Sequence, residues 1–401
     1  MKRHELFLAV ILIFFLWVYA SSEEIKLGPF EFEHAPFIEA ECSECHCSNT
    51  PNRSDVSAVI PELCYGCHDA FAGRYMHSPV GSGECLLCHD PHGSDNALFL
   101  KMKEPALCYL CHGELESDII GEKSIAHEPA LGQCTICHSP HVSDLSSSLL
   151  TEEEKKLCTE CHASKGIAMS VDTDAALYKH KPIENEKSCT YCHDAHGSTY
   201  RHHLIAKPMD LCLKCHNEEV TDDDGKALVD IKKLLEENKT HHGPIKEKNC
   251  SGCHSPHGSD YYRLLLAEYP KEFYTSSYSK DDYNLCFLCH DSRMLKEKET
   301  TSLTRFRDGK RNLHYLHVNK PEKGRTCRAC HEVHASNNFN HIRESVPFGK
   351  INWPLQLKFE PLYVDKKTGT LCSQLSNECI QRGGSCVACH SRKFYNNAES
   401  E

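Results

Sequence analysis

The sequence is poor in the residues that build a conventional hydrophobic core. Apolar residues make up 40 % of the 401, a figure that includes 27 cysteines, and there are only two tryptophans. Ile, Leu, Val and Phe are sparse in most segments, although a chain of this length ordinarily forms two or three domains with cores of their own. Something other than aliphatic side chains must therefore fill the interior.

Long basic runs are absent as well. The formal net charge is −12, and an acidic chain without a basic cluster argues against nucleic acid as a partner. The acidic balance favours solubility and would suit basic partners.

After the first twenty residues, no stretch is long and apolar enough to cross a bilayer as a helix. Residues 1–20 begin with Lys2 and Arg3, continue as an apolar run, and end with Val18 and Ala20 at the −3 and −1 positions of a cleavage site. This pattern is typical of a secretory signal peptide, with an uncleaved anchor as the alternative. No cysteine follows, so a lipid anchor here is not supported. We expect an exported chain that is periplasmic, associated with the outer membrane, or extracellular.

What the chain has in excess is cysteine and histidine, arranged as twelve C-x-x-C-H pentads. Each pentad supplies two cysteines and one histidine, and together they use 24 of the 27 cysteines. The pentads are Cys42–Cys45–His46, Cys64–Cys67–His68, Cys85–Cys88–His89, Cys108–Cys111–His112, Cys134–Cys137–His138, Cys158–Cys161–His162, Cys189–Cys192–His193, Cys212–Cys215–His216, Cys250–Cys253–His254, Cys286–Cys289–His290, Cys327–Cys330–His331 and Cys386–Cys389–His390.

Three chemistries compete for these cysteines. Exported cysteines commonly form disulfides, and paired C-x-x-C modules can form four-cysteine zinc sites. Neither requires a histidine after every second cysteine. Covalent attachment of haem c does, because two thiols bond the haem vinyl groups and the adjacent histidine binds the iron. The pattern therefore predicts haem c at every pentad.

The pentads are grouped into six pairs, which indicates an internal repeat. A histidine, often near a proline, lies seven to ten residues before the first pentad of each pair; these upstream histidines are His34, His77, His127, His180, His242 and His317. In five pairs a second histidine lies three positions after the histidine of the first pentad, as in HDPHG. These internal histidines are His92, His141, His196, His257 and His334. The first pair departs from the pattern, because Cys47 and no second histidine follow His46.

On these motifs the chain resembles the doubled-CXXCH family of multihaem c-type cytochromes, related in style to the cytochrome c3 group. The resemblance covers nearly the whole mature chain. It implies haem c at each pentad, two histidine ligands on most irons, and electron transfer between closely spaced haems.

Counting ligands leaves sixteen mature histidines outside the pentads for twelve irons. The upstream and internal sets supply eleven sixth ligands, and the twelfth is sought among five further candidates: His202, His203, His241, His314 and His341. Methionine could also bind iron, but the five mature methionines occupy no repeated position, so we expect them to fill gaps against porphyrin.

Local geometry predicts which iron a histidine serves. Three residues apart on a helical turn, His89 and His92 would project to one side, so His92 cannot reach the far face of the iron that His89 binds. We expect His92 to bind the other haem of its pair, at Cys108 and Cys111. The upstream His77 is then expected to serve the haem at Cys85 and Cys88.

The expected fold is mainly irregular, with short helices around a stack of covalently bound haems and little β-structure. The predicted segments are the signal peptide at 1–20 and haem pairs at 21–74, 75–123, 124–170, 171–221, 222–300 and 301–401. Within them, apolar periodicity predicts an amphipathic helix over 222–240 that packs on the haem stack, with a partner-binding face as the alternative. Residues 340–385 are predicted to form a small β-hairpin, because LQLKF alternates apolar and polar residues and residues 365–369 have the pattern of a turn. Cys372 and Cys379 are candidates for a disulfide. Cys47 would then be either a free thiol or part of an intermolecular bond.

An electron carrier without catalytic residues is the function that these features favour, with other redox proteins as donor and acceptor. A multihaem reductase is the alternative. Its candidate active haem is the one at Cys64 and Cys67, because the partner histidine expected after His46 is absent. A third possibility is structural: the subunit polymerises into a haem filament or inserts through a porin-like partner in the outer membrane.

Overall fold

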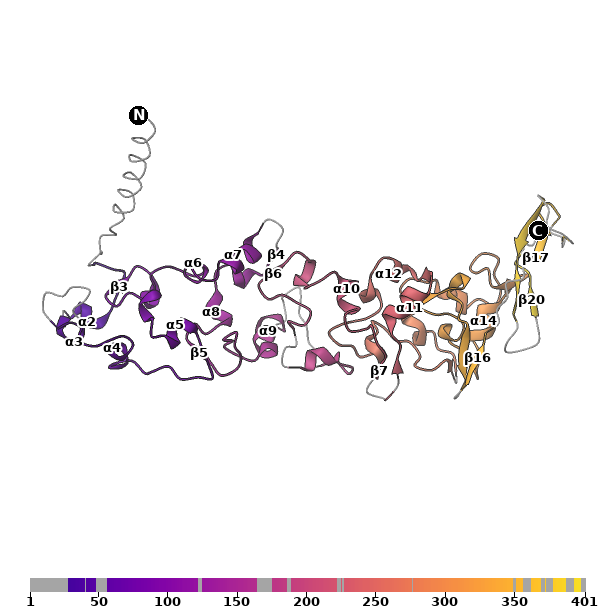
Figure 1. Cartoon of the computed structure of the whole chain (residues 1–401). Helices are drawn as coiled ribbons and strands as arrows, with labels where there is room; N and C mark the ends of the chain where they lie inside the picture. Colours follow the sequence, from indigo (N-terminus) through magenta and orange to yellow (C-terminus); the bar gives the residue numbers. More distant parts are fainter. Residues whose placement is uncertain are drawn as a thin grey trace, which may run out of the picture. The chain divides into compact units, whose positions relative to one another are not determined.

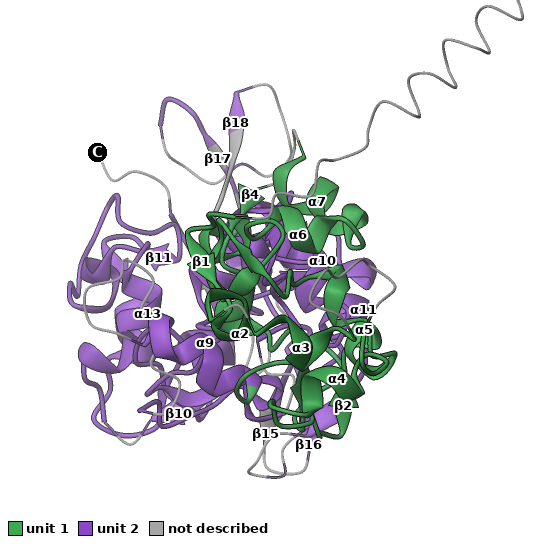
Figure 2. Ribbon diagram, turned by 90° about the vertical axis from the view of Figure 1, so that its left-hand side faces the viewer, with its two compact units in different colours: residues 1–153 green, residues 154–401 purple. Residues whose placement is uncertain are grey.

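The structure is a computed structural model, which describes residues 28–39, 41–47, 56–121, 125–163, 175–185, 189–221, 225, 227–275, 277–348, 351–355, 362–368, 372, 378–386 and 393–397. The chain divides into two compact units, unit 1 up to Glu153 and unit 2 from Glu154 onward (Figure 2). This boundary lies inside the segment predicted for the third haem pair, 124–170. The six-pair division stays a prediction, and the signal peptide lies outside the described residues.

Short helices joined by irregular connections make up both units (Figure 1), as the sequence predicts. The longest described helix has nine residues. The α-helices are α2 (Ala35–Ile38), α3 (Cys42–Cys45), α4 (Glu62–Tyr65), α5 (Ser78–Gly81), α6 (Ala106–Tyr109), α7 (Gly113–Ile120), α8 (Cys134–Cys137), α9 (Glu154–His162), α10 (Pro208–Cys212), α11 (Ile231–Glu237), α12 (Gly243–Lys246), α13 (Asn284–Phe287) and α14 (Leu313–Val318). Several of these coincide with pentads, and 3₁₀ turns such as Cys85–Leu87 cover others.

The strands are two to four residues long and pair in twos. They are β1 (Phe32–Glu33), β2 (Tyr75–Met76), β3 (Gly93–Ser94), β4 (Ile125–Ala126), β5 (Val142–Ser143), β6 (Gly197–Ser198), β7 (Val220–Thr221), β8 (Ala227–Leu228), β9 (Thr240–His241), β10 (Tyr274–Thr275), β11 (Arg307–Asp308), β12 (Arg311–Asn312), β13 (Gly324–Arg325), β14 (Ala335–Ser336), β15 (Ser345–Phe348), β16 (Ile351–Pro354), β17 (Leu362–Asp365), β18 (Cys379–Arg382), β19 (Gly384–Cys386) and β20 (Lys393–Tyr395).

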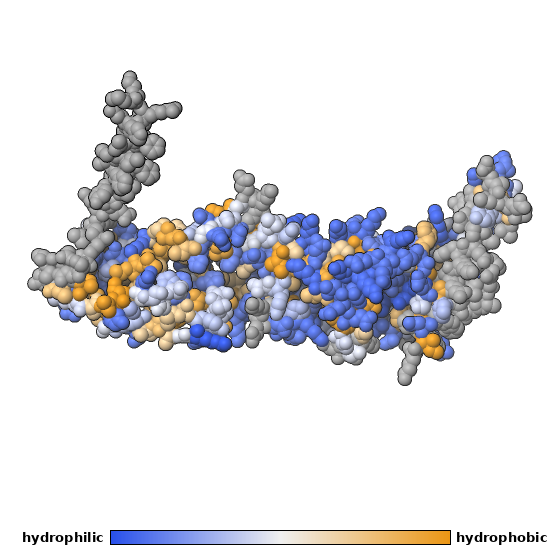
Figure 3. Space-filling view, in the orientation of Figure 1, coloured by the Kyte–Doolittle hydropathy of each residue, from blue (hydrophilic) through white to orange (hydrophobic). Residues whose placement is uncertain are grey.

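Buried apolar side chains are few, as the composition predicts. In the described part of unit 1, Ile119 is the one buried apolar side chain, whereas Leu98 and Leu110 are 74 % and 65 % exposed. Figure 3 shows apolar residues across the visible surface of this unit. Unit 2 has two small clusters, one centred on Tyr269, Tyr283, Leu295 and Val318 and one on Leu235, Ile245 and Ala335. Unit 1 therefore lacks a protein core of ordinary size over its described residues.

The helix predicted over 222–240 is shorter than expected. It spans Ile231–Glu237 (α11), and its N-cap is Asp230, whose carboxylate accepts the Lys233 N–H at 2.8 Å. Leu228 lies instead in β8, which pairs with β7. The capping carboxylate begins the helix here because it satisfies one of the free N–H groups of the first turn, whereas Asp222 to Asp224 lie outside the described residues.

The predicted C-terminal hairpin is in fact two hairpins, β15 with β16 and β17 with β18, followed by a third pairing of β19 with β20. The turn expected at 365–369 is present, because the Asp365 carboxylate accepts the N–H groups of Lys367 and Thr368 at 2.9 Å each. Of LQLKF, only its first residue is described, and it lies after β16. The structure contains the Cys372–Cys379 disulfide that the sequence predicts, and Cys47 is an exposed free thiol.

Candidate haem sites

Each described pentad forms about one helical turn. The backbone N–H of the pentad histidine donates to the carbonyl of the first cysteine, for example from His46 to Cys42 at 2.8 Å and from His112 to Cys108 at 3.0 Å. Residues separated by three and four positions share one face of such a turn. Both thiols and the histidine can therefore reach a single haem, as attachment of haem c requires.

Nine pentad histidines face a second histidine ring from elsewhere in the chain. In each case the ring planes are within 25° of parallel, and the ring centroids are 6.0 to 6.4 Å apart. In unit 1 the pairs are His34 with His68, His46 with His92, His77 with His112, and His89 with His141. In unit 2 they are His180 with His216, His193 with His257, His242 with His290, His254 with His334, and His314 with His331.

This spacing fits two imidazoles that bind one iron from opposite faces of a haem. With metal–nitrogen bonds of about 2.0 Å and a ring centre about 1.1 Å beyond the nitrogen, two such ligands place their centroids roughly 6.2 Å apart. Direct aromatic packing gives a different separation: Phe71 lies over His141 with centroids 4.3 Å apart. The donor set, its spacing and the scarcity of a protein core all fit haem c at these pentads.

The structure pairs the histidines differently from the local geometry expected above. His92 faces His46, which belongs to the preceding pair, and not the ring of His112. His77 faces His112, the second pentad of its own pair, and not His89. The expectation that His92 serves an iron other than that of His89 agrees with these contacts, but both predicted partners are wrong.

The reason lies in the backbone after the pentad. The two residues that follow His92 form β3, which pairs with β1 just before His34, and the His34 N–H donates to the His92 carbonyl at 3.2 Å. His89 itself forms a β-bridge to Leu100, so His89 and His92 do not share a helical turn. The glycine of HDPHG is required here, because a Cβ on Gly93 would lie 2.6 Å from the Phe32 carbonyl oxygen.

The same antiparallel contact recurs in other pairs. The His77 N–H donates to the His141 carbonyl at 2.9 Å, with β2 paired to β5, and the His242 N–H donates to the His334 carbonyl at 3.0 Å, with β9 paired to β14. One short strand pair thus holds together the two histidines that face the two pentads of a single haem pair. These two histidines come from different repeats.

A hydrogen bond at the second ring nitrogen fixes the tautomer of many of these rings. The Nδ1 atoms of His89, His193 and His254 lie 2.7 to 3.0 Å from backbone carbonyl oxygens. The Nδ1 atoms of His77 and His180 lie 2.9 and 3.0 Å from the carbonyls of Pro140 and Pro256. A carbonyl can only accept, so Nδ1 carries the proton, and the lone pair is on Nε2, the atom available to iron.

Sequence reasoning missed the loop whose carbonyls accept from the Nδ1 atoms of the pentad histidines. A serine two positions after each internal histidine donates its hydroxyl to a carbonyl six or seven residues on, at 2.5 to 2.7 Å; these serines are Ser94, Ser143, Ser198, Ser259 and Ser336. In the loop of Ser94, Leu98 and Phe99 have positive φ, and the Leu98 carbonyl accepts from His89. The repeated serine was the signal in the sequence that could have identified this loop.

The first and last pairs depart from the regular histidine pattern. The first pair has no internal histidine, and its second pentad is faced by His34 at 6.0 Å. In the last pair, α14 supplies His314, which faces His331 at 6.4 Å. Asn312 holds α14 in place: its fully buried amide accepts two N–H groups of the helix and donates to the carbonyls of Met294 and Glu297.

Of the five further candidates, His314 faces a pentad ring, that of His331. The backbone carbonyl of His202 accepts from Nδ1 of His193, and the backbone carbonyl of His203 accepts from the backbone N–H of Asp194. The His241 Nε2 lies 3.0 Å from two backbone carbonyls, so that nitrogen does not face an iron. His341 packs edge-on against the ring of His242, with centroids 5.6 Å apart.

Burial lowers the pKa values of several of these rings. It lowers the pKa of His334 to about 4, with the neighbouring His254 as the next cause, and the pKa of His314 to about 4, with His331 next. Burial also lowers the pKa values of His180 and His216. A neutral imidazole offers its lone pair to a metal at neutral pH, whereas a protonated one does not.

Cysteines of consecutive pentads lie side by side in chain order. The thiols of Cys64 and Cys85 hydrogen-bond, as do those of three further pairs: Cys108 with Cys134, Cys212 with Cys250, and Cys286 with Cys327. Within a haem pair the second cysteines are neighbours, since burial and then Cys67 raise the pKa of the Cys45 thiol. The five pentads of unit 1, and the pentads of unit 2 from Cys189 to Cys327, therefore lie next to one another in chain order. Among the described residues, no group of three or more His, Cys, Asp or Glu side chains is arranged to hold a metal ion by itself.

Comparison with known proteins agrees with this geometry. The family described as "Doubled CXXCH motif" matches residues 34–73, 77–117, 127–167, 180–221 and 242–295, and each match begins at an upstream histidine. The chain belongs to this family of multihaem c-type cytochromes. The five matches cover five of the six pairs and indicate covalently bound haem c in this cytochrome.

One curated relative is the "Multiheme cytochrome MtrA" of Shewanella baltica (strain OS185), which is 25 % identical over 216 residues. The match covers 50 % of this chain and 54 % of the relative, so the cytochrome aligns with about half the relative's length. Over its described residues, the cytochrome has no helix long and apolar enough to span a membrane.

Proposed function

We propose that this cytochrome conducts electrons along twelve haems c, each with two histidine ligands. The observation that carries the proposal is the set of nine facing histidine pairs with centroids 6.0 to 6.4 Å apart. The pentad histidines are the proximal ligands, and the facing histidines are the sixth ligands. For the three remaining irons the predicted sixth ligands are His127, His196 and His317; the last pentad histidine, His390, lies outside the described residues.

The order of the pentads supports conduction rather than isolated redox sites. Thiols of successive pentads are in contact within each unit, so thioether edges of successive haems would be neighbours. Haem supplies the one-electron chemistry, while the chain supplies the ligands, the spacing and the burial that set each potential. An acid, a base or a nucleophile is not needed for this function.

A reductase is less well supported than a conduit. Its basis in the sequence was an open coordination position at the haem of Cys64 and Cys67, and His34 faces the ring of His68 at 6.0 Å. With both axial positions filled, an iron offers no site to a substrate. Terminal reduction would need an open position that these nine pairs do not provide.

The predicted signal peptide supports a location in the periplasm, at the outer membrane or outside the cell, and a role in respiratory or extracellular electron transfer. Its partners would be donor and acceptor cytochromes. A porin-like outer-membrane partner and self-assembly into a haem filament are the structural alternatives. Electron microscopy of native material distinguishes a filament from single particles.

The decisive experiment combines mass spectrometry with electron paramagnetic resonance of the oxidised, purified protein. Twelve attached haems and a spectrum of low-spin iron are expected. A mass that corresponds to fewer haems, or a substantial high-spin signal, would refute the proposal of twelve haems with two histidines each.

A further inference from the structure

An acid and a serine alternate directly before the internal histidines. The residue two positions before each internal histidine is, in chain order, Asp90, Ser139, Asp194, Ser255 and Glu332. Each also directly follows a pentad histidine, so all five occupy one structural position of the repeat. The position therefore varies in charge while the fold around it stays the same.

In all three acidic cases the carboxylate lies beside the ring of the internal histidine. The distances from the nearest carboxylate oxygen to Nδ1 are 3.7 Å from Asp90 to His92, 3.9 Å from Asp194 to His196, and 3.8 Å from Glu332 to His334. Nδ1 is the nitrogen that does not bind the iron when Nε2 does. The carboxylate thus lies on the side of the ring remote from the iron.

Local hydrogen bonds hold two of these carboxylates in place. The same Asp90 oxygen that lies beside His92 Nδ1 accepts the backbone N–H of His92 at 3.0 Å, and Asp194 accepts that of His196 at 3.0 Å. Where the position is Ser139, the hydroxyl instead accepts the Val142 N–H at 3.3 Å. The serine gives a similar local turn without a negative charge.

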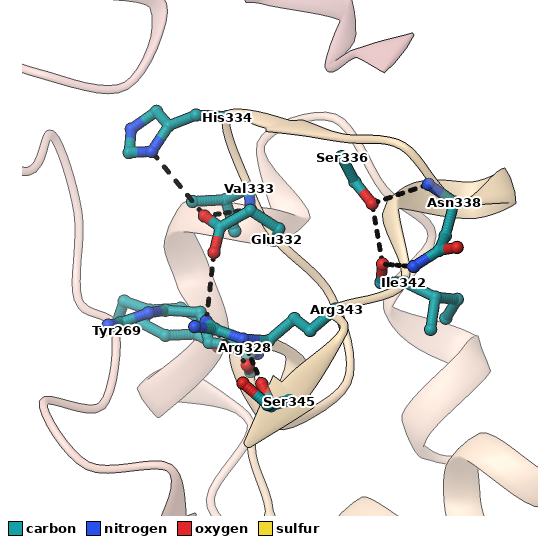
Figure 4. A network of polar contacts seen from close by, with 10 residues as sticks. All are labelled: Tyr269, Arg328, Glu332, Val333, His334, Ser336, Asn338, Ile342, Arg343 and Ser345. Atoms are coloured by element: carbon teal, nitrogen blue, oxygen red, sulfur yellow. Dashed lines mark hydrogen bonds and ion pairs between the residues drawn. The ribbon is translucent and has the colours of Figure 1, made fainter. Parts of the chain in front are cut away.

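The third carboxylate is held from its other side (Figure 4). One Glu332 oxygen lies beside His334, and the other lies 3.2 Å from a guanidinium nitrogen of Arg343. The Glu332 side chain is 23 % exposed, against 38 % for that of Asp90. The lower exposure strengthens its interaction with the ring, whereas Arg343 shares its charge.

We propose that these three carboxylates are redox-tuning residues. Each lowers the reduction potential of the haem whose sixth ligand is the neighbouring internal histidine. The proposal rests on the proposed function, because it takes the internal histidines as iron ligands. At 3.7 to 3.9 Å from Nδ1 the carboxylates act on the ring through their charge and not through a hydrogen bond. The added negative charge near the iron favours the oxidised state, and reduction adds one electron from a neighbouring haem.

The ring pairs identify the haems that are affected. His92 faces His46 and His334 faces His254, so the haems at Cys42 and at Cys250 have a carboxylate beside a ligand. His141 faces His89 and His257 faces His193, so the haems at Cys85 and Cys189 have a serine instead. Higher and lower potentials therefore alternate among these haems.

The test is a pair of opposite substitutions in the full-length holoprotein. Asp90→Asn removes the charge but keeps the side-chain oxygen that accepts the His92 N–H. A component of one-twelfth of the haem absorbance should shift to higher potential, with an about three- to tenfold change in the ratio of oxidised to reduced iron at a fixed potential. Ser255→Asp should shift a component of the same size to lower potential. Spectroelectrochemical titration of the α-band measures both.

Asp69→Asn is the matched control. Asp69 follows the pentad histidine His68 just as Asp90 follows His89, but no histidine lies two positions on. We expect its titration to superimpose on that of the wild type. A shift in Asp69→Asn as large as that in Asp90→Asn would attribute the effect to general surface charge and overturn the proposal.

Two measurements, made before the titration, separate this proposal from the function on which it rests. They are the haem count and the electron paramagnetic resonance spectrum, recorded for the wild type and for every variant. Fewer than twelve haems, or a substantial high-spin signal, in the wild type refutes the function itself. If both are intact and Asp90→Asn and Ser255→Asp leave the titration unchanged, the tuning role is wrong and the conduit is not.

Discussion

Replacement of His92 by alanine tests which iron this histidine serves. The structure places its ring 6.2 Å from that of His46, so the haem at Cys42 and Cys45 should lose its sixth ligand. One iron of twelve, about 8 % of the total, should then change from low spin to high spin. The high-spin signal in electron paramagnetic resonance, integrated against the haem content, measures this fraction, and added imidazole should abolish it.

The identity of that iron follows from a background that lacks one haem. In Cys42→Ala/Cys45→Ala, which should contain eleven haems, adding His92→Ala should produce no further high-spin iron. In Cys108→Ala/Cys111→Ala, adding His92→Ala should still produce one. The reverse result would restore the pairing expected from the helical turn and refute the one drawn from the ring geometry.

Three further predictions concern unit 2. His314→Ala should convert one iron to high spin, whereas His341→Ala, whose ring packs edge-on against a ligand ring, should convert none in the same spectrum. Asn312→Ala should lower the free energy of unfolding of unit 2 by about 3 kcal/mol, because it leaves buried backbone groups without partners; a loss below 1 kcal/mol in guanidinium unfolding would contradict this. Cys379→Ser should destabilise the β17–β18 hairpin by about 2.5 kcal/mol from loop entropy, and faster proteolysis there, with haem content unchanged, is the expected result.

Local sequence was enough for features that short-range chemistry fixes. Attachment of haem needs two cysteines and a histidine within one helical turn, so each pentad is complete in five residues. The scarcity of aliphatic residues likewise predicted short helices in irregular chain, because haem must replace the missing core. The disulfide between Cys372 and Cys379 could also be predicted from the sequence, since it joins residues seven positions apart.

The bounds of individual helices and hairpins were harder to predict from the sequence. The 222–240 segment has helical periodicity, yet the helix begins only after Asp230, because a cap and the β7–β8 pairing decide the boundary. The C-terminal part formed two hairpins and a third strand pair where one hairpin was expected. In both cases pairing between separate segments overrode a local pattern.

What the sequence by itself determined is the inventory: twelve C-x-x-C-H pentads, their grouping into pairs, and the histidines that are candidates for sixth ligands. Only the tertiary structure decided which histidine faces which pentad. The reason is that the register is set by backbone bonds between residues far apart, such as His34 to His92, 58 positions along the chain. These bonds place His92, His141 and His334 against a pentad of the preceding pair, whereas the last pair takes His314 from a helix.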